Sequence, residues 1–530
     1  MRQGVSSGAA HRGGKGSFPF RCAAVDVGSN AVRFLAASFT APSAYTVLRE
    51  ERSAVRLGHG VFLTGRLSPK EAAAAVAVLK GYAAQMRALK ITTCRAVATS
   101  AVRESANGQA FLERVHRESG LKLEVISGSE EARLVHRAVS SRVNFSDGTW
   151  LMVDLGGGSV EVSLANAGGV LWSESHTMGS VRLLEQLAGG DESPGAFLRL
   201  LEEYARTLRV PAALEGTRPA GFIATGGNIE TLAQMAAAEP DPAGVARFPV
   251  AVLRRLIRQL ARLGYRERVQ QLGLREDRAD VILPAAIVYE RLARLCGAGE
   301  VVVPFVGVRE GTVLDLADGL SVGTERRDRR EKQVLQAALA VGRKYRFDEA
   351  HGLHVARLSL SLFDQLKRLH GSGEEEREAL QAAALLHDIG AFVSYKSHHK
   401  HSLYLIANSE LPGVGPRQLQ IVANVARYHR RAPPKPQHAD FAALAPADQV
   451  AVSKLAALLR LADAMDREHQ QKVRAVKVKV SDGALRLAME GEGDLLLEGW
   501  ALKRKSDLFK KAYGLEVIVA PGRGGKEEAR

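Results

Sequence analysis

The chain of 530 residues contains only three cysteines, Cys22, Cys94 and Cys296, which are far apart in the sequence. Three dispersed cysteines exclude a disulfide framework and a four-sulfur metal site, so a reducing compartment is expected. No apolar run approaches the ~18 residues that a membrane-spanning helix needs. The basic residues among the first twenty are followed by no apolar segment, which argues against a signal peptide. We expect a cytoplasmic protein with no membrane partner.

The charge balance is strongly positive. Lys and Arg together number 73 and Asp and Glu 58, which gives a formal net charge of +15. Such a balance favours anionic partners: nucleic acid, phosphate chains, nucleotides or an acidic surface. The hydrophobic fraction of 46% and the charged fraction of 25% are ordinary for a globular protein and exclude wholesale disorder. At roughly 150 residues per domain, the length predicts three or four domains.

From residue 18 to about 320, short apolar runs alternate with Ala- and Leu-rich stretches, a pattern typical of α/β architecture. We expect strands at residues 23–25, 32–37, 123–126, 151–153 and 160–164, and helices at 69–89 and 252–263. The charged segment 325–332 predicts a linker or the start of a helix. Residues 333–467 are expected to be almost wholly helical. A final alternating segment with a Ser-Asp-Gly turn at 481–483 predicts a hairpin.

These changes of pattern predict the domain boundaries. The expected domains are a first α/β domain at 20–145, a second at 146–322, a helical domain at 323–470 and a small α+β domain at 471–520. Basic, disordered tails are expected at 1–19 and 521–530.

One internal repeat connects the two α/β domains. Residues 25–30 (Val-Asp-Val-Gly-Ser-Asn) resemble residues 153–159 (Val-Asp-Leu-Gly-Gly-Gly-Ser): in both, an apolar strand ends in an Asp, passes a Gly-rich turn and continues as an apolar strand. Such turns bring backbone N–H groups close to phosphate. Asp26 and Asp154 would repel a phosphate directly, so their presence at these turns predicts a cation between carboxylate and phosphate. Mg²⁺ is the expected cation, because it binds carboxylate and phosphate oxygens. The repeat predicts two similar domains that face each other across a cleft.

A third turn, Ala-Thr-Gly-Gly-Asn at 224–228, follows an apolar run and precedes a helix, whose N-terminus offers another anion site. Each turn alone is compatible with an ordinary connection. Three in this order resemble the duplicated ribonuclease H-like ATPase fold of actin, sugar kinases and heat-shock chaperones. The segments Ala-Thr-Ser-Ala-Val-Arg (98–103), Ile-Ser-Gly-Ser-Glu-Glu-Ala-Arg (126–133) and Val-Arg-Glu-Gly (308–311) narrow the resemblance to the exopolyphosphatase/guanosine pentaphosphate phosphohydrolase (Ppx/GppA) family, over about residues 20–520.

This resemblance implies removal of a terminal phosphate by water, with Mg²⁺. Glu131 matches the family's general base and Asp154 its metal-holding carboxylate; Asp26 and Glu161 are further metal candidates. The candidates for phosphate binding are Gly28, Ser29, Asn30, Arg103, Gly156, Gly157, Gly158, Ser159, Gly226 and Gly227. Other roles stay open: Glu131 in the first turn of a helix, Arg103 in a surface salt bridge, and Glu161 facing solvent on its strand.

The helical region has a second constellation. A His-Gly-Leu-His segment at 351–354, a His-Asp pair at 387–388 and Asp463 occur in the order found in HD phosphohydrolases, which bind divalent metals between helices. We predict His354, His387, Asp388 and Asp463 as ligands of Mn, Fe, Co or Zn. Further ligands are available among His398, His399, His401 and His429. The alternative is that these residues only pack and cap helices.

The sequence thus predicts an exopolyphosphatase, expected as a homodimer, whose partner is inorganic polyphosphate; nucleic acid is not expected. The basic runs 427–431 and 503–511 could extend a polyanion channel or simply form solvated faces. Three alternatives stay open: a guanosine pentaphosphate (pppGpp) 5′-phosphohydrolase, a second hydrolytic activity at the HD-like residues, and a catalytically silent regulator that binds nucleotide or polyphosphate.

Overall fold

The computed structural model describes residues 18–145, 148–187, 194–208, 219–320, 324–430 and 432–519. The predicted tails lie outside these ranges, apart from Phe18 and Pro19, and so does Arg431 of the first basic run. The chain forms two compact units, divided between Arg329 and Arg330. Each unit is described by itself below.

The first sheet of the N-terminal unit has the strand order β3-β2-β1-β4-β5. Its first three strands form an antiparallel meander, and β4 and β5 add to β1 in parallel. The strands are β1 (Phe20–Val27), β2 (Val32–Ala41), β3 (Ala44–Ser53), β4 (Thr93–Ala98) and β5 (Leu123–Val125). All five strand segments predicted in the two α/β domains lie within or overlap observed strands.

The second sheet has the order β10-β11-β9-β6-β7-β8. It repeats the first: β6, β7 and β8 form an antiparallel meander, β9 and β11 continue from β6 in parallel, and β10 is an added antiparallel edge. The strands are β6 (Trp150–Leu155), β7 (Val160–Asn166), β8 (Gly169–His176), β9 (Phe222–Thr225), β10 (Ala246–Pro249) and β11 (Glu300–Val303). The shared order confirms the predicted duplicated fold.

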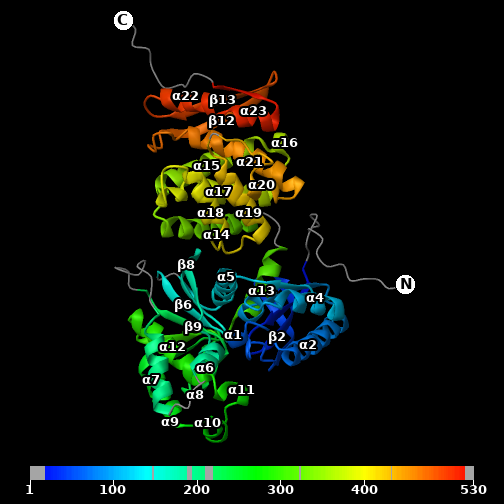
Figure 1. The fold of residues 1–530 in the computed structure, drawn as a ribbon, viewed down its shortest axis with the longest axis vertical. Helices are drawn as coiled ribbons and strands as arrows, with labels where there is room; N and C mark the ends of the chain where they lie inside the picture. Colours follow the sequence, from blue (N-terminus) through cyan, green and yellow to red (C-terminus); the bar gives the residue numbers. More distant parts are fainter. Residues whose placement is uncertain are drawn as a thin grey trace, which may run out of the picture. The chain divides into compact units, whose positions relative to one another are not determined.

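Helices connect and cover these sheets (Figure 1). They are α1 (Val61–Thr64), α2 (Pro69–Ala88), α3 (Ser100–Arg103), α4 (Gly108–Ser119), α5 (Gly128–Val139), α6 (Ser180–Leu187), α7 (Pro194–Ala205), α8 (Gly227–Met235), α9 (Val250–Arg262), α10 (Tyr265–Leu272), α11 (Glu276–Ala279), α12 (Ile282–Leu295) and α13 (Val308–Asp318). The predicted helix at 69–89 is α2, which begins after Ser68, whose side chain accepts a hydrogen bond from the Glu71 N–H, with Pro69 at its first position.

Helix α13 belongs by sequence to the predicted second α/β domain, but it packs on the first sheet. Val313, Leu314 and Ala317 form one buried cluster with Cys22 of β1 and Leu35 of β2. The apolar side of α13 covers a face of the first sheet that would otherwise be exposed to water. The chain therefore returns to the first sheet before it leaves the unit.

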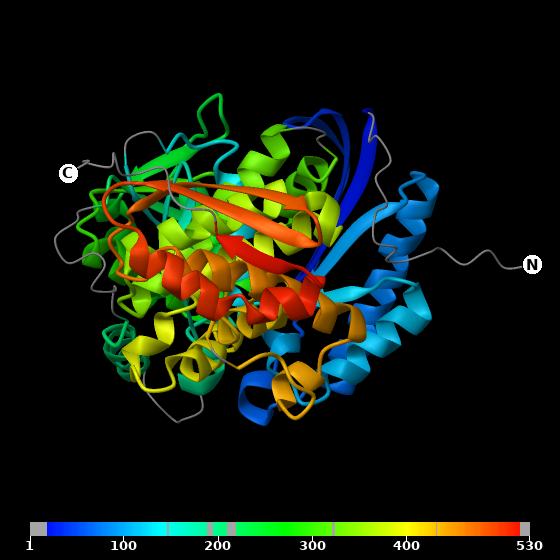
Figure 2. The same cartoon turned by 90° about the horizontal axis from the view of Figure 1, so that it is seen from above.

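The C-terminal unit is helical with one three-stranded sheet (Figures 1 and 2). Its helices are α14 (Thr324–Lys344), α15 (Glu349–Gln365), α16 (Lys367–His370), α17 (Glu374–Leu386), the 3-10 helix η2 (Ile389–Phe392), α18 (His398–Ala407), α19 (Pro416–Arg427), α20 (Ala439–Ala442), α21 (Pro446–Ala464), α22 (Leu496–Lys505) and α23 (Asp507–Tyr513). The sheet, in the order β12-β13-β14, consists of β12 (Val473–Ser481), β13 (Ala484–Gly491) and β14 (Glu516–Val519). The charged segment 325–332 lies in α14, so it belongs to a helix.

The small α+β segment has no core of its own. Leu485 and Leu487 of β13 and Phe509 of α23 are fully buried in the same cluster as Leu458 of α21. Asp482 and Gly483 have φ of 53° and 70°, as the hairpin predicted at this turn requires. Among the described residues, no helix combines the length and apolar character that crossing a membrane requires.

Candidate active site

A cavity of about 580 Å³ opens between the two sheets of the N-terminal unit. The three Gly-rich turns meet there, as the repeat predicted. The predicted phosphate-binding residues that line it are Gly28, Ser29, Asn30, Gly156, Gly157, Ser159, Gly226 and Gly227. Gly158 is not among the lining residues: a Cβ at this position would collide with the Phe62 ring and the Ser100 Oγ, so this glycine permits packing.

The two repeated turns have the same backbone geometry. The N–H of Gly28 donates to the Ala31 carbonyl at 3.1 Å, and the N–H of Gly156 donates to the Ser159 carbonyl at 3.0 Å. The first glycine N–H of each turn is therefore used within the turn. In the third turn, Gly226 has φ of 102° and a Cβ there would collide with the Leu155 carbonyl, so glycine is required.

Three buried carboxylates lie close together: Glu131 and Asp154 line the cavity, and Glu161, which is not among the lining residues, lies beside them. Oxygen atoms of Glu131, Asp154 and Glu161 all lie within 4.8 Å of one another. Glu131 lies in the first turn of α5, which begins after Ser127, whose side chain accepts a hydrogen bond from the Glu130 N–H. Asp154 and Glu161 are directly opposite each other on the antiparallel strands β6 and β7. Like charges in such a pair are destabilising, so the arrangement calls for a compensating cation.

The carboxylates are only partly satisfied by hydrogen bonds. Asp154 Oδ1 accepts from Thr225 Oγ at 2.7 Å, and Glu161 Oε1 accepts from Ser175 Oγ at 2.9 Å. Glu131 Oε2 and Glu161 Oε2 are buried without a hydrogen-bond partner. Burial raises the pKa of Asp154 to about 6, and burial with the Asp154 charge raises the pKa of Glu161 to about 7. Burial, reinforced by Glu161 and Asp154, raises the pKa of Glu131 well above its ordinary value.

This group fits a divalent cation with oxygen ligands. Two of its oxygens are buried without a hydrogen-bond partner, one oxygen of each residue lies within 4.8 Å of the others, and a bound cation would remove their mutual repulsion. Asp26, which the sequence placed with the metal candidates, is arranged differently. It lies directly opposite Arg33 on β1 and β2, and the Arg33 Nη1 donates to its Oδ2 at 3.2 Å. Asp26 is therefore outside the carboxylate group, because its charge already has a partner.

A model of the Ppx/GppA phosphatase family matches residues 37–319, and a model of domain III of this phosphatase family matches residues 330–508. This chain belongs to the Ppx/GppA phosphatase family. The prediction of the family is confirmed, and the protein is accordingly an enzyme, a phosphatase.

The chain is also similar to solved structures of other proteins. An exopolyphosphatase from Cytophaga hutchinsonii is 28% identical, with a TM-score of 0.53 over 57% of this chain and 100% of its own. An exopolyphosphatase-like protein is 25% identical, with a TM-score of 0.51 over 57% of this chain and 100% of its own. A Ppx/GppA family member from Aquifex aeolicus is 27% identical, with a TM-score of 0.49 over 57% of this chain and 99% of its own.

In this Ppx/GppA phosphatase, Arg103 lies against the predicted base. Its Nη1 donates to the Ile126 carbonyl at 2.7 Å and is 3.9 Å from Glu131 Oε2. Arg103 is not among the cavity-lining residues. The structure thus places Arg103, the predicted phosphate clamp, beside Glu131 rather than in the cavity lining.

The predicted site did not include the arginines of the cavity, which are Arg33, Arg52, Arg275, Arg278 and Arg309. Arg278 is buried, and its Nη1 donates to Asn228 Oδ1 at 3.0 Å. Burial, together with the charges of Arg33 and Arg52, lowers its pKa to about 9. Mutually repelling cations in a cavity favour a bound polyanion. Four of these arginines belong to no motif, so no signal in the sequence marked them; only Arg309 belongs to a quoted segment.

The Val-Arg-Glu-Gly segment, Val308–Gly311, also packs against the helix that carries Glu131, the predicted base. A Cβ at Gly311 would collide with the Leu134 carbonyl of α5, so glycine lets α13 pack closely against α5. Helix α5 carries Glu131. The segment therefore contributes both a cavity arginine and the close helix contact behind the predicted base.

In domain III, the structure brings together three of the four HD-like residues. His387 and Asp463 lie with His351, and Asp388 lies with His398 and His429. His354, the predicted ligand, is outside these groups. It lies one turn further along α15, where its Nδ1 accepts from Arg357, which also contacts the β12 backbone. His351 takes the place that the sequence assigned to His354, because it faces α17 and α21 rather than β12.

Proposed function

We propose that the N-terminal unit is an exopolyphosphatase that removes the terminal phosphate of inorganic polyphosphate. The observation that carries this proposal is the group of three buried carboxylates at one side of an arginine-lined cavity. Carboxylates that need a cation and a cavity lined by arginines are complementary to a metal-bound polyphosphate chain, whose phosphates would compete with the carboxylates that already pair with Arg33, Arg52 and Arg309. The likeness to an exopolyphosphatase from Cytophaga hutchinsonii supports this choice of substrate.

Asp154 and Glu161 would hold Mg²⁺, the cation that prefers carboxylate and phosphate oxygens. When bound, Mg²⁺ would neutralise charge on the transferring phosphoryl group. The Thr225 and Ser175 hydroxyls fix one oxygen of each carboxylate, so the other oxygens stay directed at the shared space.

Glu131 is the general base of the proposed reaction. Its carboxylate accepts a proton from the water whose oxygen attacks the terminal phosphorus, while the bridging P–O bond breaks and the shortened chain leaves with that oxygen. A carboxylate with its pKa held above the ordinary range is better matched to this task at neutral pH. The Ile126 carbonyl holds Arg103 in place, and the positive charge of Arg103 lies 3.9 Å from Glu131 Oε2, where it would favour the ionised form of the base.

The remaining phosphates of the chain would meet the cavity arginines. Arg33, Arg278 and Arg309 come from three distant segments, and their guanidinium groups can each contact two phosphate oxygens. Ser29, Asn30 and the N-terminus of α8 at Gly227 add neutral donors.

One observation favours pppGpp as a second candidate substrate. The cavity lining also includes the apolar side chains of Met235, Leu272, Leu274 and Phe305. A nucleobase could cover this apolar part while its phosphates contact the arginines. Inorganic polyphosphate has no apolar group that could contact these side chains. The two substrates can therefore be distinguished by comparing their hydrolysis.

The test is phosphate release from long-chain polyphosphate with Mg²⁺ by the intact protein and by Glu131→Gln. We expect the variant to lose about 10²–10⁴-fold in kcat. Glu130→Gln is the matched control: the Arg133 Nε donates to Glu130 at 2.7 Å and Arg95 also pairs with it, so turnover should persist. Equal rates for the intact protein and Glu131→Gln would overturn the assignment of the base.

Substrate choice is tested on the same preparations. For polyphosphate, the KM should fall with chain length and rise with salt, since successive phosphates meet successive arginines. If pppGpp is hydrolysed with the higher kcat/KM and polyphosphate competes poorly, the second candidate replaces the first. The expected homodimer would be tested by analytical ultracentrifugation.

A further inference from the structure

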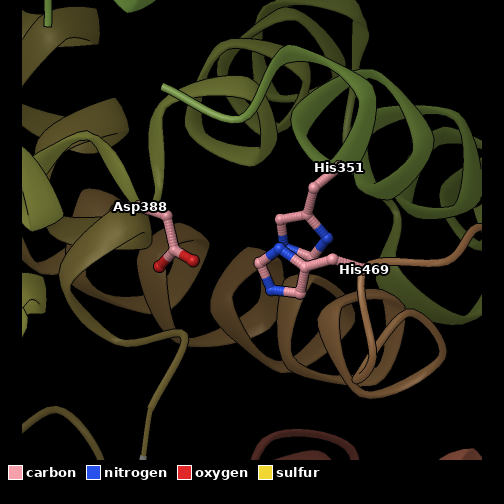
Figure 3. Close-up of side chains that lie close together, drawn as sticks. All are labelled: His351, Asp388 and His469. Carbon is pink, nitrogen blue, oxygen red and sulfur yellow. The ribbon is translucent and has the colours of Figure 1, made fainter. Parts of the chain in front are cut away.

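Six potential metal ligands form two groups in the C-terminal unit, far in sequence from the Glu131 site, and a seventh, His469, lies beside two of them. Two groups contain, respectively, His351, His387 and Asp463, and Asp388, His398 and His429; within each, one ligand atom per residue lies within 4.8 Å of the others. A third group joins His351, Asp388 and His469, whose side chains point toward a common space in Figure 3. The ligands come from five segments: α15, the end of α17, α18, the end of α19 and α21.

The hydrogen bonds of four histidines fix which ring nitrogen carries the proton. The partners of Nδ1 are Asp466 Oδ2 for His351 (2.8 Å), the Ala384 carbonyl for His387 (2.7 Å), the Tyr395 carbonyl for His398 (3.1 Å) and the Ala426 carbonyl for His429 (2.6 Å). These partners only accept, so each Nδ1 must donate its hydrogen. A neutral imidazole has one N–H, so each Nε2 presents a lone pair.

These lone pairs face one another. The Nε2 atoms of His351 and His387 are 3.3 Å apart, and those of His398 and His429 are 3.0 Å apart. With both Nδ1 atoms protonated, a neutral pair has no hydrogen to place between its Nε2 atoms. Close lone pairs in a buried place repel, and only a positive charge between them relieves that repulsion. That charge is either an added proton or a metal ion.

The carboxylates lie where they favour a metal ion. Asp463 Oδ1 is 3.9 Å from the Nε2 of both His351 and His387. Asp388 Oδ1 is 3.0 Å from His398 Nε2 and 3.3 Å from His429 Nε2, yet it is buried with no hydrogen-bond partner. With their hydrogens on Nδ1, the neutral rings of His398 and His429 present lone pairs rather than N–H groups to Oδ1, so the two nitrogens and the oxygen converge without a hydrogen between them.

Asp388 faces both groups. While Oδ1 faces His398 and His429, its Oδ2 is 3.7 Å from His387 Nε2. Lys505 binds Asp463 through Oδ2, which leaves the Oδ1 of Asp463 directed at the first histidine pair. Asp388 therefore contacts both histidine pairs. Asp463 contacts only the pair formed by His351 and His387.

We propose that this cluster binds two divalent transition-metal ions, one held by His351, His387 and Asp463 and the other by His398 and His429, with Asp388 bridging them. Mixed imidazole and carboxylate ligands favour Mn, Fe, Co or Zn over Mg. The Nδ1 hydrogen bonds are of the kind that ligating histidines make to orient their rings. The Asp388 side chain is 30% exposed and that of His469 38%, so the centre is open to solvent on one side, unlike a closed structural site.

The test measures metal bound to the full chain. The protein is incubated with Mn²⁺, Co²⁺ or Zn²⁺, dialysed, and analysed by plasma mass spectrometry. We expect about two ions per chain. His351→Ala and His429→Ala should each retain about one ion, and Asp388→Asn should lose both, because it removes the shared ligand.

His354→Ala is the matched control, because His354 lies one turn from His351 on α15 but outside the groups. It should bind as much metal as the intact protein. Circular dichroism of each variant verifies that the fold persists, and Asp154→Asn excludes a contribution from the cleft.

The proposal is overturned if the intact protein keeps no transition metal, if Asp388→Asn keeps as much as the intact protein, or if His354→Ala loses as much as His351→Ala. If the intact protein keeps no transition metal, added protons rather than metal ions lie between the paired Nε2 atoms. None of these outcomes depends on polyphosphate hydrolysis, so the metal centre and the proposed function are tested separately.

Discussion

The two halves of the N-terminal unit share a strand order but place different partners beside the same aspartate. In the first half, Asp26 lies directly opposite Arg33; in the second, Asp154 lies directly opposite Glu161. The first pair is an ion pair at 3.2 Å, whereas the second is a pair of like charges beside Glu131. The duplicated backbone provides the same frame twice. The difference is the residue opposite the aspartate. Arg33 neutralises Asp26 in the first half, whereas Glu161 leaves Asp154 in the second half with a need for a cation.

The largest expected effect compares the two aspartates directly. Asp154→Asn should reduce phosphate release by about 10³-fold, because it removes a carboxylate from the proposed cation group. Asp26→Asn should cost about tenfold or less, because Asp26 only compensates Arg33. Steady-state kinetics at saturating Mg²⁺ measures both. Equal losses would mean that the two halves contribute equally to cation binding, contrary to the comparison.

The next effect concerns pH. Asp154 and Glu161 have a higher pKa in the folded protein than when unfolded, so folding favours their protonated forms. This stability is complete below their ordinary pKa values and is lost as pH rises through about 6 and 7. In EDTA, we expect the free energy of unfolding to fall by about 5 kcal/mol between pH 4.5 and 7.5 through these groups.

Urea unfolding across that pH range measures this loss. Glu161→Gln should flatten the curve, since one of the groups no longer titrates, and added Mg²⁺ should remove the loss at high pH. A slope that neither change affects would assign the pH dependence to other residues.

In the first half, the test is to remove the cation beside the aspartate. Arg33→Met leaves the buried Asp26 carboxylate without its cation, and we expect the free energy of unfolding at pH 7 to fall by about 2 kcal/mol. Arg49→Met, which breaks an exposed ion pair with Glu51 on β3, is the control and should cost less than about 1 kcal/mol. Both are measured by urea unfolding. If the two variants lose equal stability, Asp26 does not depend on Arg33.

The smallest expected effect comes from a comparison of two serines on β8. The Ser175 hydroxyl donates to Glu161, and the Ser173 hydroxyl does not. Ser175→Ala removes the hydrogen bond to Glu161 Oε1 and should raise the half-saturating Mg²⁺ concentration about tenfold. Ser173, two residues earlier on β8, bonds only to Ser163 within the described contacts. Ser173→Ala should leave the Mg²⁺ requirement unchanged. Magnesium titrations of phosphate release distinguish the two variants.

Local pattern alone predicted the duplicated α/β fold, the position of α2, the hairpin at residues 481–483 and the three turns that line the cavity. These features depend on apolar periodicity and on glycine, which act over a few residues. Glu131 and Asp154 were identified by resemblance to family motifs, and the structure brings them within reach of each other. Their chemical roles remain proposals that the variants above test.

Other features were decided only by contacts between distant residues. Arg278 reaches the cavity from a segment far from the turns, α13 crosses back to the first sheet, and His351 rather than His354 joins His387. By contrast, the residue that faces the aspartate of each repeated turn, Arg33 or Glu161, lies only seven residues further along the same hairpin, where the strand register pairs the two. The sequence by itself determined which segments become strands, helices and turns, because those depend on near neighbours. Tertiary structure determined the charge environment of each carboxylate, because the free energy of a buried charge depends on whatever lies within a few ångströms of it.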